Sequence, residues 1–216
     1  MAVRMWLSGV SLHTACAAAL IVGCSRGPAR VKQPAIDPEA AGVLALEAYD
    51  TNRDGAIAGA EFDASPSLKS ARSRFDTNQD GGISAAEIAE RIKAWKAMKT
   101  GLASVRCQVM LDGKPLSGAT VDFVPEPFLG AEVKPARGTV NQFGDVAPTV
   151  SDADKPDPNL PGGVHFGLYT VQVSGGRETP PIPDRYNAKS TLGLEVSYDE
   201  PGIRDNNLAF RLKTVE

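Results

Sequence analysis

Cysteine, histidine and aromatic residues are all scarce in this chain of 216 residues. It has three cysteines and two histidines, and Phe, Trp and Tyr together make up only 6% of it. So few cysteines exclude a small scaffold built on disulfides, and so few histidines leave little for a zinc site. The formal net charge is −3. The sequence therefore has no excess of positive charge that would predict binding to nucleic acid.

A long apolar run is also missing. The best candidate, residues 7–22, is interrupted by four polar residues and follows Arg4. It is too short and too polar to span a membrane, and it is typical of an export signal. The run ends in Gly23-Cys24, which resembles the lipobox of bacterial lipoproteins, where the cysteine is lipidated and becomes the new N-terminus. We expect a lipoprotein signal peptide over residues 1–23 and lipidation at Cys24; a cleaved signal with an incidental cysteine is the alternative.

The segment after Cys24 is predicted to be a flexible tether over residues 24–36, because it contains glycine, prolines and three basic residues. Ser25 resembles the residue that follows the cysteine in lipoproteins sent on to an outer membrane. The resemblance implies an exported bacterial lipoprotein in the outer membrane, facing the periplasm or the cell surface.

Two parts follow the tether, and their apolar patterns differ. Residues 37–101 have the helical pattern, with helices expected from Asp37 to Tyr49, from Ser65-Pro66 to Phe75, and from Ser84 onward. Glycine at position 101 is expected to end the last helix in the left-handed conformation. Residues 102–216 alternate with a period of two, and proline is frequent there. We therefore predict an α + β protein in two domains, a helical domain over residues 37–101 and an antiparallel β-sandwich over residues 102–216.

Two stretches of twelve residues, 50–61 and 76–87, both read D-x-N-x-D-G with glutamate at the twelfth position. Calcium prefers six to eight oxygen ligands, and alternate positions of such a stretch present oxygens to one point as the chain turns. Glycine at the sixth position permits the turn. Both stretches resemble the EF-hand family at every constrained position, and the resemblance covers about residues 37–99.

The resemblance implies two calcium ions, one in each loop. In the first loop, a backbone carbonyl supplies one ligand, and water is expected beside Ala58, which has no side-chain oxygen. The expected ligand residues of the first loop are Asp50, Asn52, Asp54, Ala56 and Glu61. Those of the second loop are Asp76, Asn78, Asp80, Gly82, Ser84 and Glu87.

The two loops start only 26 residues apart, so the helices between them have about two turns each. Short helices have little apolar surface to expose on opening, which favours structural calcium over a calcium switch. Ile57 and Ile83 hold the eighth loop position, where EF-hand pairs form a short β-bridge between the loops, and the resemblance implies the same here.

The second part contains the turn Asp112-Gly113 between alternating runs, and further runs near Tyr169, Leu194 and Phe210. These turns and runs resemble the transthyretin-like, or carboxypeptidase-regulatory-like, sandwich family over about residues 104–213, as found in bacterial surface proteins of the planctomycete type. The resemblance implies seven or eight strands. Residues 147–163 are expected to form a loop.

No residue pattern predicts catalysis, so we expect no enzyme. His165 has no nucleophile or zinc spacing near it and is expected to be an exposed loop residue. Cys107 lies in an alternating apolar run and is expected to be a small buried hydrophobe. Asp152, Asp154 and Asp157 are expected to form a solvated acidic loop, although a third cation site is the alternative. Arg185 and Tyr186 fit either packing or a ligand contact.

These observations predict a calcium-binding, lipid-anchored structural or binding protein outside the cytoplasm. Calcium would make the helical part rigid, and the partner would be an unidentified protein or polysaccharide. Two alternatives remain open. One is a calcium-dependent sensor or adhesin that exposes a binding face, and the other is an accessory subunit of an exported enzyme.

Overall fold

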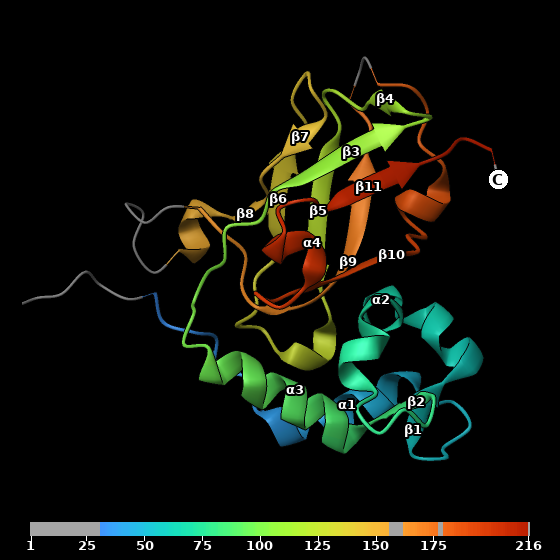
Figure 1. Cartoon of the computed structure of the whole chain (residues 1–216), viewed down its shortest axis with the longest axis vertical. Coiled ribbons are helices and arrows are strands. Elements are labelled where there is room, and N and C mark those ends of the chain that lie inside the picture. The colour runs from blue at the N-terminus through green and yellow to red at the C-terminus, as the bar shows by residue number, and fades with distance from the viewer. Residues whose placement is uncertain (1–30, 156–161, 177–178, 216) are drawn as a thin grey trace, which may run out of the picture.

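The computed structural model describes residues 31–155, 162–176 and 179–215, and every structural statement below concerns these residues. Three helices lie at one end of the molecule, and two β-sheets lie face to face at the other (Figure 1). Within these residues, no helix is both long and apolar enough to cross a membrane. The expected signal peptide and Cys24 lie outside the described residues.

The three helices of the first part begin as the sequence predicts. Asp37 accepts a hydrogen bond from the N–H of Ala40 at 3.1 Å, and Ser84 accepts one from the N–H of Glu87, so both residues act as N-caps. Each cap satisfies a backbone donor that the first helical turn leaves unpaired. The helices are α1 (Pro38–Tyr49), α2 (Pro66–Phe75) and α3 (Ala85–Ala97), with a short α4 (Pro201–Arg204) near the C-terminus.

The end of α3 differs from the prediction. Lys99, with φ of 52°, takes the left-handed conformation that was expected of Gly101. Glycine is needed at position 101 for another reason, because a Cβ atom there would lie 2.4 Å from the carbonyl oxygen of Val31. A close approach of two chain segments, which the local pattern cannot reveal, explains this glycine.

Two β-sheets form the second part. The larger has five antiparallel strands in the order β10-β9-β5-β6-β8, and the smaller has the order β11-β3-β4 with β7 paired to β3. Both sheets direct alternate apolar side chains into the space between them, where the rings of Phe123 and Phe210 meet with their centroids 6.5 Å apart. The strands are β3 (Cys107–Leu111), β4 (Lys114–Pro115), β5 (Thr120–Pro125), β6 (Ala136–Thr139), β7 (Asp145–Val146), β8 (Thr149–Val150), β9 (Gly167–Ser174), β10 (Leu192–Val196) and β11 (Ala209–Leu212).

The sandwich differs from the expected antiparallel arrangement in one strand pair. Strand β11 runs parallel to β3, with Phe210 opposite Val109. The chain leaves β10 in the larger sheet, passes through α4, and enters the smaller sheet beside β3, and a parallel pair requires such a crossover. The described residues also contain nine sandwich strands rather than seven or eight. One of the additional short strands, β8, lies inside the region that was expected to be only a loop.

The helices and the sheets share one core. Buried residues from both parts form a single apolar cluster, so the boundary predicted between residues 101 and 102 does not separate two cores. Strand β10 packs directly on α2, and a Cβ atom at Gly193 would lie 1.9 Å from the carbonyl oxygen of Pro66. Glycine therefore permits the closest approach between the helical part and the sheet.

Residues 31–36, which were expected to belong to the tether, pack against the body of the protein. The side chain of Gln33 donates to the carbonyl oxygen of Trp95 at 3.2 Å, and the N–H of Ala35 donates to Glu132 at 2.7 Å. Ile36 is buried, and its carbonyl oxygen accepts from Lys96. The expectation of a flexible tether is therefore wrong for residues 31–36, because these residues have specific contacts on α3 and on a loop of the sandwich.

Candidate metal centre

The two predicted loops lie side by side at the end of the molecule farthest from the smaller sheet (Figure 1). They are joined by the antiparallel strands β1 (Ala56–Ala58) and β2 (Gly82–Ser84), in which Ile57 lies opposite Ile83. Both isoleucine side chains are fully buried. The expected β-bridge between the loops is therefore present, and its two isoleucines fix the loops to the helical core.

The turn in each loop depends on glycine. Gly55 and Gly81 have φ angles of 94° and 98°, in the region that favours glycine. Their N–H groups donate to the first aspartate of the loop, at 3.0 Å for Asp50 and 3.1 Å for Asp76. These bonds bend each loop back on its own first residue, which the predicted ligand spacing requires.

The last glutamate of each loop closes the turn. In the first loop, Glu61 accepts hydrogen bonds from the N–H groups of Ala58, Thr51 and Asn52 and from the Thr51 hydroxyl. The bond from Ala58 is the main cause that lowers the pKa of Glu61 to about 2. Glu61 is therefore ionised at neutral pH and available to a cation.

Glu87 occupies the same place in the second loop. Partial burial by itself raises its pKa, but hydrogen bonds from the N–H and hydroxyl of Ser84 and from the N–H groups of Thr77 and Asn78 outweigh burial, so the pKa is lowered. Ser84 thus contacts Glu87 and caps α3. Its role as a calcium ligand stays a prediction from the sequence.

The asparagine and the second aspartate of each loop are joined by two hydrogen bonds. Asn52 donates its amide N–H to Asp54 at 2.8 Å and accepts from the N–H of Asp54 at 2.9 Å. Asn78 and Asp80 repeat both bonds at the same distances. Both side chains of each pair therefore have a fixed orientation within the loop, and Ala56 and Gly82 follow as the first residues of β1 and β2.

The Oδ1 atom of Asp76 in the second loop shows whether the residues of this loop fit a cation. Asp76 is 9% exposed, and its Oδ1 atom is buried without a hydrogen-bond partner. The corresponding Oδ1 atom of Asp50 accepts from the N–H of Asp54 at 3.2 Å. A buried carboxylate oxygen with no donor is unfavourable unless a cation or another donor satisfies it. The donor set of this loop therefore fits a hard cation such as calcium.

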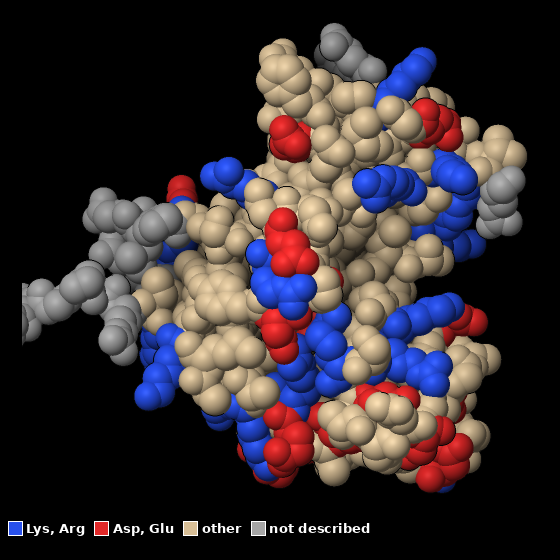
Figure 2. All heavy atoms as spheres, viewed as in Figure 1, with Lys and Arg blue, Asp and Glu red and all other residues tan. Residues whose placement is uncertain are grey.

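The six loop carboxylates make this end of the molecule acidic, and Figure 2 shows Asp and Glu side chains gathered over the part where Figure 1 places β1 and β2. Within the described residues, no three Asp, Glu, His or Cys side chains form a metal site on their own. A complete ligand shell in these loops therefore also needs the amide oxygens of Asn52 and Asn78 and backbone carbonyl oxygens, as the loop pattern implies.

The exit segments of the two loops differ. The second loop leads into α3, whereas the first leads into a short 3₁₀ helix over Gly59–Ala64. The expected exit helix of about two turns is therefore present, but it is a 3₁₀ helix rather than an α-helix, and Ser65 and Pro66 then start α2. Short exit segments leave these loops little freedom to move their helices.

A buried carboxylate of the sandwich, Glu195 on β10, holds the helices on both sides of the second loop. Glu195 is fully buried and accepts from Arg74 at 2.5 Å, from Arg91 at 2.6 Å and from the indole N–H of Trp95 at 2.7 Å. Arg91 also binds Asp199, and its hydrogen bond is the main cause that lowers the pKa of that carboxyl to about 2. Arg74 lies on α2, just before the loop, and Arg91 and Trp95 lie on α3, just after it.

A second carboxylate, Glu126, holds the helices on both sides of the first loop. It is 4% exposed and follows β5. The Tyr49 hydroxyl, at the end of α1, donates to it at 2.6 Å, and the Ser67 hydroxyl, at the start of α2, donates at 2.5 Å. We call Glu126 and Glu195 the two clamp carboxylates. Neither residue was predicted as a site residue: Glu195 is a charged residue within an apolar strand, whereas Glu126 lies between two prolines just after β5.

The remaining sequence candidates lie in different surroundings, as far as the described residues show. Cys107 is buried as expected, and burial raises the pKa of its thiol to about 12. His165 is only 6% exposed, so the expectation of an exposed loop residue is wrong; burial lowers its pKa, and its Nδ1 accepts from the N–H of Lys134. Asp152 is paired with Lys155, and Arg185 stacks on Tyr186 and donates to the carbonyl oxygen of Lys213. Asp157 lies outside the described residues.

Comparison with known proteins gives one result. A model of the EF-hand family matches residues 73–92, which include the whole second loop. No curated protein and no solved structure matches the chain. The protein therefore contains an EF-hand motif, which indicates calcium binding, together with helices and mainly antiparallel β-sheets.

Proposed function

We propose that this is a calcium-stabilised structural or binding protein with one calcium ion in each loop and no catalytic activity. The observation that carries the proposal is the buried, unpartnered Oδ1 atom of Asp76 in a loop that the EF-hand model matches. The first loop repeats the same turn, the same Asn–Asp pair and the same closing glutamate, which supports a second ion.

The residues of this chain would hold the ion as follows. The aspartate and asparagine side chains of each loop, the closing Glu61 or Glu87, and the backbone carbonyl of Ala56 or Gly82 would supply oxygen ligands to the ion. A bound calcium ion would supply positive charge that removes the repulsion among three carboxylates in each loop.

The two clamp carboxylates favour a structural role over a calcium-dependent switch. Exposure of an apolar face would require α1, α2 or α3 to move away from the sheet. Such movement would separate Arg74 and Arg91 from buried Glu195, and an unpaired buried charge is costly. We therefore propose that calcium stiffens one fixed arrangement of the helices on the sandwich.

Calorimetric titration of the full chain tests this proposal. We expect two calcium ions per chain, with Glu61→Gln and Glu87→Gln each removing one, because each variant removes one carboxylate charge from a single ligand shell. Magnesium should bind more weakly, since it requires shorter and more regular coordination than these loops provide. The absence of any binding heat at millimolar calcium would contradict the proposal. One bound calcium ion per chain would mean that only one of the two loops is a calcium site.

We further propose that the protein is an exported bacterial lipoprotein anchored through Cys24, with a transthyretin-like sandwich. The support for the anchor is the apolar stretch that ends in Gly23-Cys24, and the support for the sandwich is its turn residues and two facing sheets. Expression in a bacterial host with a radioactive fatty acid should label the chain, and Cys24→Ser should abolish the label. Label that persists in this variant would disprove lipidation at Cys24.

A further inference from the structure

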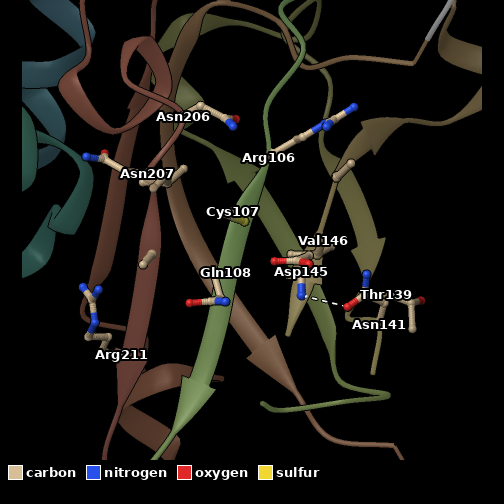
Figure 3. A pocket seen from close by; sticks show the side chains of 13 residues that line it. Arg106, Cys107, Gln108, Thr139, Asn141, Asp145, Val146, Asn206, Asn207 and Arg211 are labelled. Atoms are coloured by element: carbon tan, nitrogen blue, oxygen red, sulfur yellow. Dashed lines mark hydrogen bonds between the residues drawn. The ribbon is translucent and has the colours of Figure 1, made fainter. Parts of the chain in front are cut away.

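The outer face of the smaller sheet is hollowed. The hollow has a volume of about 810 Å³ and lies over β3, between β11 on one side and the turn before β7 on the other (Figure 3). We call it the outer trough. Its lining includes Arg106, Gln108, Asn141, Asp145, Asn207 and Arg211.

The strand pattern explains why this face is polar. On β3, the side chains of Cys107, Val109 and Leu111 are buried in the sandwich, so Gln108 and Met110 lie on the outer face, with Arg106 just before the strand. On the neighbouring β11, Arg211 lies opposite Met110. Met110 is four positions after Arg106, so Arg106 and Arg211 lie roughly 13 Å apart along the strand direction.

Two arginines and three amide side chains of the trough have no partners within the described residues. Six of the nine described arginines pair with a carboxylate or a carbonyl oxygen elsewhere, namely Arg72, Arg74, Arg91, Arg137, Arg185 and Arg204. Of the three that do not, Arg106 and Arg211 line the trough. In the described structure, the side chains of Gln108, Asn206 and Asn207 also have no intramolecular hydrogen bond. These groups are free to bind a ligand.

The wall of the trough beside β7 is fixed in place. The side-chain oxygen of Asn141 accepts from the N–H groups of Phe143 and Asp145, at 2.8 and 3.0 Å. The carbonyl oxygen of Gly144 accepts from the N–H of Val109 at 2.8 Å, which attaches the turn to β3. Phe143, at the tip of this rigid turn, is 65% exposed. A rigid turn thus forms one wall of the hollow, and Phe143 at its tip is exposed to solvent without lining the hollow.

We propose that the outer trough binds an acidic polysaccharide, a chain of sugars that carry carboxylates. Each guanidinium can hold one carboxylate through two parallel hydrogen bonds, and the spacing of Arg106 and Arg211 suits carboxylates on different sugars of one chain. The amides of Gln108, Asn206 and Asn207 both donate to and accept from hydroxyl groups.

An acidic peptide fits the trough less well. Asp145 lies opposite Gln108 and has no cation partner among the described residues, and the ionised carboxylates of an acidic peptide have no proton to donate to it. The same carboxylate is a good acceptor for sugar hydroxyls. Amide and carboxylate groups outnumber the two arginines, which matches a ligand with more hydroxyls than charges. The proposal does not rest on calcium binding, because the trough shares no residue with the calcium loops.

The test uses the full chain, saturated with calcium and then freed of excess calcium, with short galacturonic acid oligomers as the probe. Calorimetry at low salt should detect binding, and the double variant Arg106→Gln/Arg211→Gln should weaken it by about tenfold or more, since charged hydrogen bonds carry the contact. The control Lys69→Gln/Lys189→Gln removes the same charge at exposed positions away from the trough and should bind as the unaltered chain does.

The outcomes separate a specific site from general attraction. Equal losses in the trough variant and the lysine control would overturn the proposal, because they would show that only net charge matters. Equal binding of polyglutamate would also overturn it in favour of any polyanion, and so would the absence of binding to the oligomers at low salt. All variants lie on the surface, so an unchanged unfolding temperature would confirm that losses reflect the site.

Discussion

Saturating calcium is expected to raise the free energy of unfolding by about 5 kcal/mol when free calcium is 100 times the dissociation constant of each site. A ligand that binds only the folded state at this excess contributes about 2.7 kcal/mol per site, and the two loops add. The loops are parts of the folded core, with Ile57 and Ile83 fully buried, so an unfolded chain would not preserve them. Urea unfolding followed by circular dichroism, with calcium or with a chelator, measures the difference.

The double variant Glu61→Gln/Glu87→Gln provides the control for this effect. It removes one carboxylate from each loop, so its stability should hardly change on addition of calcium. A matched variant, Glu39→Gln/Glu90→Gln, removes two carboxylates that contact Lys93 on the surface and should retain the full calcium effect. Calcium-dependent stability that is equal in all three proteins would show that the loops do not bind the ion.

Glu195→Gln is expected to lower the free energy of unfolding by about 3–5 kcal/mol, because it removes one partner of a buried ion pair, leaves Arg74 without its carboxylate and leaves Arg91 with Asp199 alone. The arginines concerned, Arg74 and Arg91, have side chains only 19% and 11% exposed. The NH₂ group of glutamine would also face the N–H donors that the carboxylate of Glu195 now accepts from. Chemical unfolding of the calcium-loaded proteins measures the change.

A surface carboxylate serves as the comparison. Glu90 pairs with Lys93, but its side chain is 72% exposed, so Glu90→Gln should cost less than about 1 kcal/mol. If Glu195→Gln were as mild as Glu90→Gln, the clamp carboxylate would not fix the helices on the sheet. The proposed structural role of calcium would then lose its main support against a switch.

The calcium loops could be predicted from the sequence because their constraints are local. Each loop encodes its turn, its ligands and its closing glutamate within twelve consecutive residues, and the facing of Ile57 and Ile83 follows from a pair of such loops. The N-caps at Asp37 and Ser84 are equally local. The alternation of Val109 and Leu111 likewise indicated which side of β3 is buried.

The clamp carboxylates could not be predicted in this way. The run Leu194-Glu195-Val196 alternates, and an alternating strand normally exposes its charged residue to water. All three residues are buried here, because α2 and α3 cover the face of β10 that the pattern assigns to solvent. The partners of Glu195 lie about 100 positions away in the chain, at Arg91 and Trp95. Only the folded arrangement brings them together.

Because residues 31–36 contact the folded part of the protein, only a short linker can separate that part from a lipid on Cys24. Seven peptide steps join Cys24 to Val31, and a fully extended chain of that length reaches roughly 25 Å. If the chain is anchored at Cys24 as proposed, a body fixed from Val31 onward would be confined within about one domain diameter of the bilayer surface. Its calcium loops and its outer trough would meet only what lies next to that membrane, and a partner deeper in the compartment would have to extend toward it.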